Sequence, residues 1–364
     1  MAQDRMLVVW HDLALAHDTG EGVFEGPPSD MLAHQMKHPE NAERVANMKR
    51  SLEKGPAAPF IDWRPGRLAT AEEIIRVHDH DYYAELLAAE AMGGRSFSGS
   101  TVFGRHSLDP IRAAAGSALV AVDAILGGET KMAYALVRPP GHHAQPTRAD
   151  GYCFVNNAAV AAQRALDAGV ERVAIIDWDV HHGNGTQECF YDRDDVLTIS
   201  LHMHHGSWGP SHPQTGEPDE TGTGKGKGFN VNIDLPLGLG DETYRAAFEE
   251  IVAPKVDAFR PGLIIIANGQ DANQFDPNGR QLVTTKGFHT LGAMARELAA
   301  RHTGGKLLSV QEGGYNPAYA ALCAHATVEG FLGLERKTPD PIAYMPEDVA
   351  LGKSAVRALK DRLL

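Results

Sequence analysis

Short, nearly continuous apolar runs recur along the chain, and longer segments with helical spacing separate them. Such runs are typical of parallel β-strands that helices cover on both faces, because neither face of the strand then meets water. The runs that we predict as strands span residues 6–10, 133–137, 173–177, 196–202, 263–268 and 307–311. Their alternation with helices predicts an α/β fold, a doubly wound parallel sheet with helices on both faces.

The predicted helices fill the segments between these runs. Residues 110–126 show the pattern clearly, since apolar residues recur at helical spacing behind Pro110, and proline suits a first helical turn. The other segments with this pattern span 155–169, 241–259 and 287–301. The sequence contains no linker, internal repeat or low-complexity tract, so we expect residues 1–364 to form a single domain.

The charge balance and the cysteines narrow the class of protein. The 364 residues carry 34 Lys and Arg against 47 Asp and Glu, a net charge of −13. This balance argues against a nucleic-acid partner, because such proteins cluster cations against phosphates. No stretch approaches the roughly 20 apolar residues that span a bilayer. The three cysteines lack disulfide or metal-site spacing. We therefore expect a soluble cytoplasmic protein without nucleic-acid or membrane partners.

Polar clusters follow four of the predicted strands. They lie in the segments 138–143, 178–185, 269–271 and 312–315, which are rich in histidine, aspartate and glycine. Ligand crevices of open α/β sheets lie beyond the carboxyl ends of the strands. We therefore expect four separate strands to deliver these side chains to one site.

One cluster has the spacing of a metal site. Asp179 and His181 lie two residues apart just beyond a strand, so an extended backbone points both side chains the same way. With Asp271 they form a set of nitrogen and oxygen ligands that leaves room for water, as in catalytic divalent-ion sites. A carboxylate–histidine hydrogen bond explains a single such pair equally well, but three candidate ligands favour metal binding.

Two further features suit proton transfer. His142 and His143 follow a Pro-Pro-Gly turn, and adjacent imidazoles near a metal site can serve as general base and general acid. Tyr315 follows Gly-Gly and offers a hydroxyl to a developing oxyanion. Taken alone, a His-His pair is more often structural and such a tyrosine more often packs in a core. For His182 the sequence leaves two positions possible, one in the core and one in the site.

Several motifs, in this order, resemble those of the histone deacetylase superfamily. They are RPPGHHA at 138–144, GYCFVNNAAVA at 151–161, DWDVHHGNGTQ at 177–187, GQDA at 269–272 and EGGYN at 312–316. The likeness extends over about residues 38–331 and is to class II enzymes and their bacterial members, the histone deacetylase-like amidohydrolases, with acetylpolyamine amidohydrolases as relatives. It implies an arginase-like α/β fold and zinc-dependent hydrolysis of acetylated amines, with release of acetate.

The resemblance also implies a role for each matching residue. The implied catalytic residues are His142, His143 and Tyr315, and the implied ligands of one zinc ion (Zn²⁺) are Asp179, His181 and Asp271. Relatives pair the first histidine with the position of Asp177 and the second with that of Asn184. An amide partner does not stabilise an imidazolium as a carboxylate does, so we expect His143 to stay neutral until it accepts a proton from water.

The same resemblance implies structural potassium (K⁺) next to the zinc. The positions that match this site are Asp177, Asp179, His181, Ser200 and Leu201, several of them through backbone carbonyls. A second monovalent-cation site maps to Phe190, Arg193, Val196 and Phe229.

Four residues are implied at the substrate, namely Gly151, Tyr152, Gly313 and Trp208. Ser100 stands where many deacetylases carry an aspartate that grips the peptide backbone, which weakens the expectation of a peptide substrate. Residues 21–37 form an insertion relative to the simplest members. We expect it at the rim of the entrance, where it narrows the opening or contacts a second subunit of a homo-oligomer, a dimer or tetramer. A tolerated surface loop is the alternative.

The expected substrate is a small acetylated amine or an acetyl-lysine side chain. Two alternatives stay open at this point. One is hydrolysis of another acyl or aryl amide with the same zinc machinery, and the other is a non-catalytic protein that binds acetylated ligands. The complete set of candidate catalytic residues argues against the second alternative.

Overall fold

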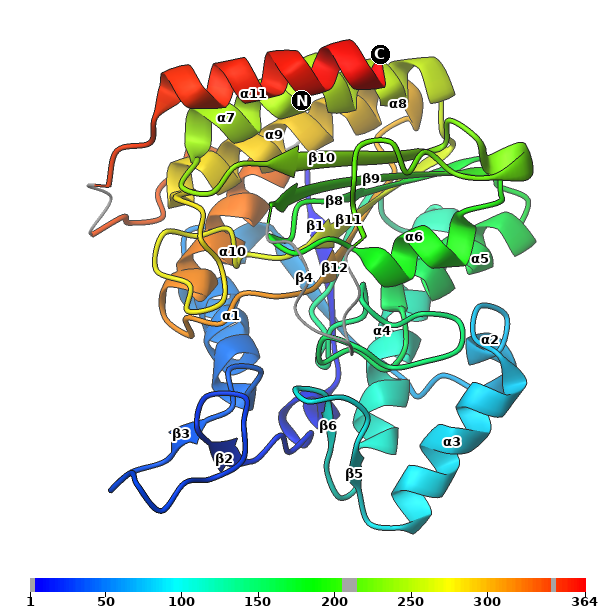
Figure 1. The fold of residues 1–364 in the computed structure, drawn as a ribbon. Helices are drawn as coiled ribbons and strands as arrows, with labels where there is room; N and C mark the ends of the chain where they lie inside the picture. Colours follow the sequence, from blue (N-terminus) through cyan, green and yellow to red (C-terminus); the bar gives the residue numbers. More distant parts are fainter. Residues whose placement is uncertain (1–3, 205–214, 342–344) are drawn as a thin grey trace.

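An eight-stranded parallel sheet forms the centre of the protein in the computed structural model, which describes residues 4–204, 215–341 and 345–364 (Figure 1). The strands are β1 (Met6–Trp10), β4 (Ile61–Pro65), β7 (Met132–Ala135), β8 (Val173–Asp177), β9 (Val196–Met203), β10 (Asn230–Leu235), β11 (Leu263–Asn268) and β12 (Leu307–Gln311). Their order across the sheet is β10-β9-β8-β11-β12-β7-β1-β4. The predicted α/β fold with a central parallel sheet is confirmed.

The strands predicted from apolar runs are the inner strands of this sheet. β1, β8, β11 and β12 have the predicted bounds, while β7 and β9 differ by one or two residues. The two edge strands, β4 and β10, were not predicted from the sequence. β10 places Asn230, Asn232 and Asp234 at alternate positions, and β4 exposes Asp62, so neither strand is a continuous apolar run.

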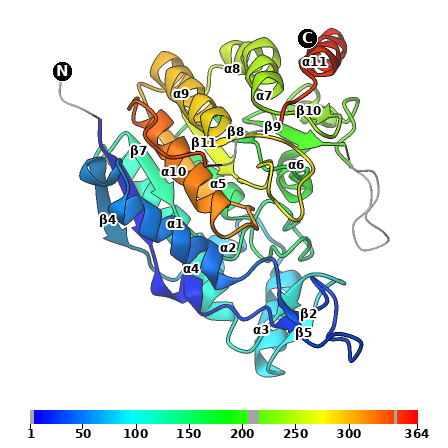
Figure 2. The same ribbon diagram turned by 90° about the vertical axis from the view of Figure 1, so that its left-hand side faces the viewer.

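Helices cover both faces of the sheet (Figures 1 and 2). One face carries α1 (Ala42–Lys54), α7 (Asp241–Ala247), α8 (Ala253–Phe259), α9 (Thr285–His302), α10 (Tyr319–Phe331) and α11 (Val349–Leu363). The other face carries α4 (Leu108–Leu126), α5 (Asn157–Asp167) and α6 (Asn184–Phe190). A smaller cluster beside α4 includes α2 (Ala71–Ile74) and α3 (His80–Ala91). Short 3₁₀ turns occupy Asp12–Leu15, Ala58–Phe60 and Gly224–Gly226.

Two points about the helices bear on the predictions. The helix expected over 241–259 consists of three consecutive segments, because a π-helical turn at Phe248–Val252 separates α7 from α8. Within the described ranges, no helix combines the length and the apolar character that crossing a membrane requires.

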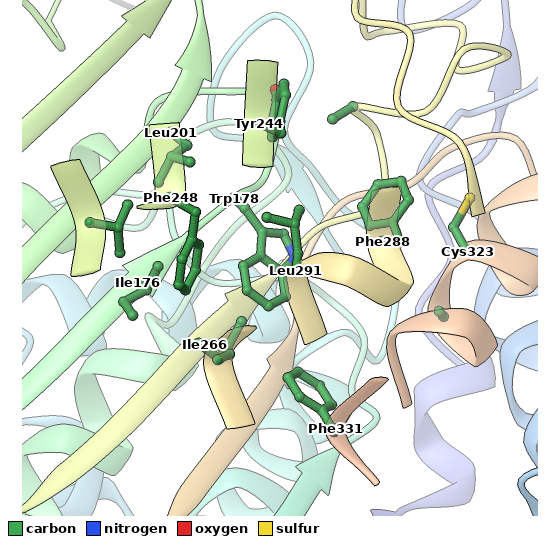
Figure 3. Close-up of a cluster of buried hydrophobic side chains, with 14 of the residues drawn as sticks. Ile176, Trp178, Leu201, Tyr244, Phe248, Ile266, Phe288, Leu291, Cys323 and Phe331 are labelled. Atoms are coloured by element: carbon green, nitrogen blue, oxygen red, sulfur yellow. The ribbon is translucent and has the colours of Figure 1, made fainter. Parts of the chain in front are cut away.

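The core on the α9 side contains Trp178, which follows directly after β8 (Figure 3). Its indole is fully buried and stacks on Phe331, with 6.2 Å between the ring centroids. The indole Nε1 donates a hydrogen bond to Asn268 Oδ1 at 2.9 Å. Because Asn268 ends β11, this contact joins the ends of two neighbouring strands and fixes the loops that follow them.

Two small hairpins lie side by side at one end of the molecule (Figures 1 and 2). One pairs β2 (Glu21–Gly22) with β3 (Met36–Lys37), inside the predicted insertion, and the other pairs β5 (Arg95–Ser96) with β6 (Val102–Phe103). His38 links them, because its Nε2 donates a hydrogen bond to the Ser100 carbonyl oxygen at 3.2 Å. The insertion is therefore attached to the loop that carries Ser100.

Candidate active site

The polar clusters follow strands that are neighbours in the sheet. β8, β11, β12 and β7 lie next to one another in that order. Because all of these strands run parallel, their carboxyl ends form one continuous edge. The structure thus brings together the four polar segments that the sequence analysis singled out.

The residues after β8 alternate between the core and the site. The side chains of Trp178 and Val180 are fully buried in the core on the α9 side. Asp179 and His181 point instead to Asp271, which lies in the loop after β11. This alternation is the extended-chain periodicity on which the metal-site prediction rests.

Asp179, His181 and Asp271 form a compact set of possible metal ligands. One donor atom from each residue lies within 4.8 Å of the other two. The Nδ1 atom of His181 is 3.2 Å from Asp179 Oδ1 and 3.1 Å from Asp271 Oδ2. Two carboxylates and one imidazole nitrogen, all aimed at one point, fit a divalent cation of the zinc type.

The electrostatics of these three groups also fit a cation. Burial and the negative charge of Asp179 raise the pKa of Asp271 to about 8. Burial works to lower the pKa of His181, but its hydrogen bonds to the two carboxylates outweigh burial and raise that pKa to about 10. The two buried carboxylates thus share one positive charge, that of His181. A bound divalent cation would compensate the negative charge that remains.

The backbone holds the carboxylates in place. The Gly313 N–H donates to Asp179 Oδ2 at 2.8 Å, and the Val180 N–H donates to Asp271 Oδ1 at 2.8 Å. A Cβ atom at Gly313 would lie 2.2 Å from Asp271 Oδ2, so only glycine fits this position. The structure therefore places Gly313, expected at the substrate, behind the candidate metal ligands.

The two adjacent histidines have different partners. His142 Nδ1 hydrogen-bonds to Asp177 Oδ2 at 2.9 Å, and His143 Nδ1 hydrogen-bonds to Asn184 Oδ1 at 2.6 Å. Burial works to lower the pKa of His142, but the negative charges of Asp179 and Asp177 raise it well above its usual value. The amide of Asn184 offers His143 no such charge. The structure thus shows the partners that the resemblance implied.

A pocket of about 210 Å³ opens next to these residues. The residues that line it are Glu25, Gly99, Ser100, His143, Asp150, Gly151, Tyr152, His181, Asn278 and Tyr315. Gly151 and Tyr152, both expected at the substrate, are among them. Trp208 lies outside the described residues.

Tyr315 lies in the wall of this pocket with its side chain almost fully buried. Its ring packs edge-on against Tyr152 at 5.5 Å, and the Arg44 guanidinium lies 5.0 Å from its centroid. Burial, then the negative charges of Asp179 and Asp271, raise the pKa of Tyr315 well above its ordinary value. The phenol therefore keeps its proton and can act as a hydrogen-bond donor.

Several lining residues were missed by the sequence analysis. Glu25 lies in the insertion, Asp150 precedes the GYCF motif, and Asn278 lies seven positions after Asp271. None of them belongs to a motif with recognisable spacing. Ser100, which stands where many deacetylases carry an aspartate, also lines the pocket.

The residues implied for the first monovalent cation lie at or near the carboxyl ends of β8 and β9. Asp177 and Ser200 are register partners of β8 and β9, Leu201 follows Ser200, and a small cavity of about 10 Å³ touches both partners. The second set surrounds the turn after α6, where the Arg193 N–H donates to the Phe190 carbonyl oxygen at 3.1 Å. Val196 begins β9, and the Phe229 carbonyl oxygen accepts from that strand.

Comparison with known proteins identifies the family to which the chain belongs. The family described as "Histone deacetylase domain" matches residues 38–331, most of the chain. The chain belongs to the histone deacetylase family. Its members act on acetylated substrates, and the protein is a deacetylase-type hydrolase of that family.

The relatives come from plants as well as bacteria. The chain is 48% identical to Histone deacetylase 8 of Arabidopsis thaliana, over 99% of this chain and 97% of that protein. It is 41% identical to a histone deacetylase-like amidohydrolase of Pseudomonas aeruginosa, over 84% and 80%. The solved HDA15 HD domain has 34% identity and a TM-score of 0.85, over 100% of this chain and 95% of that structure. The likeness is thus wider than the bacterial members named in the sequence analysis.

Proposed function

We propose that the protein is a zinc-dependent amidohydrolase that removes acetyl groups from acetylated amines and releases acetate. The observation that carries the proposal is the convergence of three candidate metal ligands, two differently partnered imidazoles and a buried phenol. His181, His143 and Tyr315 line one pocket. This set supplies every group that hydrolysis of an amide by activated water requires.

Asp179, His181 and Asp271 would hold the ion. Bound Zn²⁺ supplies Lewis-acid polarisation of the acetyl carbonyl and lowers the pKa of a water molecule from about 15.7 towards about 7. The Gly313 and Val180 N–H groups keep the two carboxylates aimed at the ion-binding point. His142, held by Asp177, lies beside this point, with its Nε2 3.7 Å from Asp179 Oδ1.

His143 is the proposed proton carrier. With Nδ1 donating to Asn184, a neutral ring presents Nε2 as the acceptor for the proton of the attacking water. The same nitrogen then returns that proton to the amine that leaves. Tyr315 would donate its O–H to the negative charge that develops on the acetyl oxygen.

The proposal includes a structural role for K⁺. Asp177 lies between His142 and the cavity that Ser200 lines, so a cation there would bear on the carboxylate that holds His142. Asp179, His181 and Leu201 complete the proposed ligand set, in which several positions act through backbone carbonyls.

A panel of substrates tests the proposed function. Acetate release is measured on acetylputrescine, acetylcadaverine, an acetyl-lysine peptide and an acetanilide, with zinc-loaded protein and with protein treated with chelator. We expect hydrolysis of at least one acetylated amine, lost on chelation and restored by Zn²⁺. Turnover of the acetanilide alone favours the first alternative. No turnover of any member, with calorimetric binding of an acetylated amine, favours a binding protein.

A further inference from the structure

The mouth of the pocket carries a carboxylate that the proposed reaction does not use. Glu25 lines the pocket that also contains His143, His181 and Tyr315. It belongs to the 21–37 insertion, and its side chain is only half-buried. A carboxylate at the entrance of a deacetylase pocket must act on the part of the substrate that lies beyond the acetyl group.

Contacts around Tyr152 keep Glu25 close to the mouth. The Tyr152 hydroxyl accepts a hydrogen bond from Asn278 Nδ2 at 3.0 Å. Burial, and next the negative charge of Glu25, raise the pKa of Tyr152 well above its usual value, and a hydrogen bond to Glu25 adds to this rise. Glu25 and Tyr152 line the same pocket, so the carboxylate lies at this wall.

The base of the insertion is also fixed. The ring of His38, the residue directly after β3, packs edge-on against Tyr152 at 4.8 Å. Its Nε2 donates to the Ser100 carbonyl oxygen, and Ser100 lines the same mouth. The hairpin that carries Glu25 is thus tied to two walls of the pocket.

The charges of the lining favour a cation. Glu25 and Asp150 are its carboxylates, and among the described residues that line it there is no lysine or arginine. Asn278 is more than nine-tenths buried, and within the described part of the chain its Oδ1 has no hydrogen-bond partner. An unsatisfied buried acceptor beside a carboxylate suits a ligand that brings N–H donors and positive charge.

We infer that Glu25 determines specificity, by binding a second, cationic nitrogen of the substrate. The substrate class that this favours is the mono-acetylated diamine or polyamine, in which an ammonium group lies a few carbons beyond the amide. The inference rests on the proposed function, since it assigns the substrate of that same site. Glu25 touches no reacting atom, so its effect falls on the choice of substrate.

The test compares two substrates that differ in one charge. Acetylputrescine carries an ammonium group, and N-pentylacetamide has a methyl group in its place. We expect zinc-loaded Glu25→Gln to lose about tenfold or more in kcat/KM on acetylputrescine, mainly through KM, because the amide cannot pair with the ammonium charge as a carboxylate does. Its kcat/KM on N-pentylacetamide should stay within about twofold of wild type.

Glu21→Gln is the matched control, because Glu21 is exposed on the same hairpin and does not line the pocket. It should leave both substrates unchanged. The inference is overturned if Glu25→Gln leaves the preference for the charged substrate intact, or lowers both substrates equally. If wild type hydrolyses an acetyl-lysine peptide but not acetylputrescine, the inference fails and the proposed function stands. If it hydrolyses no acetylated amine at all, the proposed function fails. Calorimetric binding of acetylputrescine then still decides the role of Glu25, and equal Kd values for wild type and Glu25→Gln overturn it.

Discussion

At the scale of single residues, two adjacent histidines in the site differ in their hydrogen-bond partners. Asp177 gives His142 a carboxylate, which favours a charged ring, whereas Asn184 gives His143 an amide. Proton transfer near pH 7 needs a ring that can alternate between its two forms. In the proposed reaction, this pairing favours His143 as the carrier of the mobile proton.

Tyr315→Phe tests the oxyanion donor. We expect turnover of an acetylated amine to fall about a hundredfold or more, because one oxyanion donor contributes about that much. Zinc content, measured by atomic absorption, should equal that of wild type, since the tyrosine hydroxyl is not among the proposed ligands.

Tyr244→Phe is the control for this substitution. Tyr244 is a fully buried tyrosine whose hydroxyl has no hydrogen-bond partner among the described residues. Its removal should leave both activity and stability almost unchanged. Near-normal turnover in Tyr315→Phe would show that another group stabilises the oxyanion.

The chemistry-bearing residues could be predicted from the sequence because they follow strands and have local spacing. Asp179 and His181 are two residues apart on an extended chain, and His142 and His143 follow a rigid turn. Glu25 and Asn278 could not be predicted in this way. Their positions depend on how loops fold around the mouth of the pocket, and neither the hydrophobic periodicity nor a short motif predicts this.

At the scale of elements, His78 joins the segment between α2 and α3 to the loops around the site. Its Nδ1 donates to the Gln145 carbonyl oxygen at 2.9 Å, and its Nε2 accepts from the Asn156 N–H at 2.9 Å. Asn156 is the N-cap of α5 and accepts from the Ala159 N–H. Both ring nitrogens are thus used by a neutral imidazole.

The stability of the protein should therefore fall in mild acid. Burial lowers the pKa of His78 from 6.5 to about 4, so the folded state resists a proton that the unfolded chain accepts. The contribution is fully present above pH 6.5 and is lost as the pH falls towards 4. At about 1.36 kcal/mol per pH unit, the loss is about 2 kcal/mol at pH 5.

Denaturant unfolding of His78→Asn at pH 7 and pH 5 measures this contribution. The variant should be less stable than wild type at pH 7 but lose about 2 kcal/mol less between the two pH values. His106→Asn serves as the control, because the side chain of His106 is 80% exposed. An unchanged pH dependence in His78→Asn would assign the acid sensitivity to other groups.

At the scale of the whole molecule, the order of the strands creates the site. The polar segments are far apart in the sequence, yet they follow the adjacent strands β8, β11, β12 and β7. The apolar runs predict these inner strands because both of their faces are buried. The edge strands β4 and β10 and the two hairpins lie where water or polar side chains interrupt the pattern, so they could not be predicted from it.

A metal bound between β8 and β11 should stabilise the whole fold, because Asp179 and Asp271 follow these neighbouring strands. An ion at one hundred times its Kd contributes about 2.7 kcal/mol if it binds only the folded protein. We expect Zn²⁺ to raise the Tm of chelator-treated protein and to leave the Tm of Asp271→Asn nearly unchanged. Equal zinc-dependent shifts in both proteins would place the ion elsewhere.

The central claim is that the set of residues around Asp179, His181 and Asp271 hydrolyses acetylated amines with one metal ion. The direct measurement is the rate of acetate release from acetylputrescine and from an acetyl-lysine peptide as Zn²⁺ is added to metal-free protein. The account predicts no release without metal and a rise that ends at one ion per chain, absent in Asp271→Asn. Release by the metal-free protein, or no release of acetate at any ratio of zinc to protein, would contradict it.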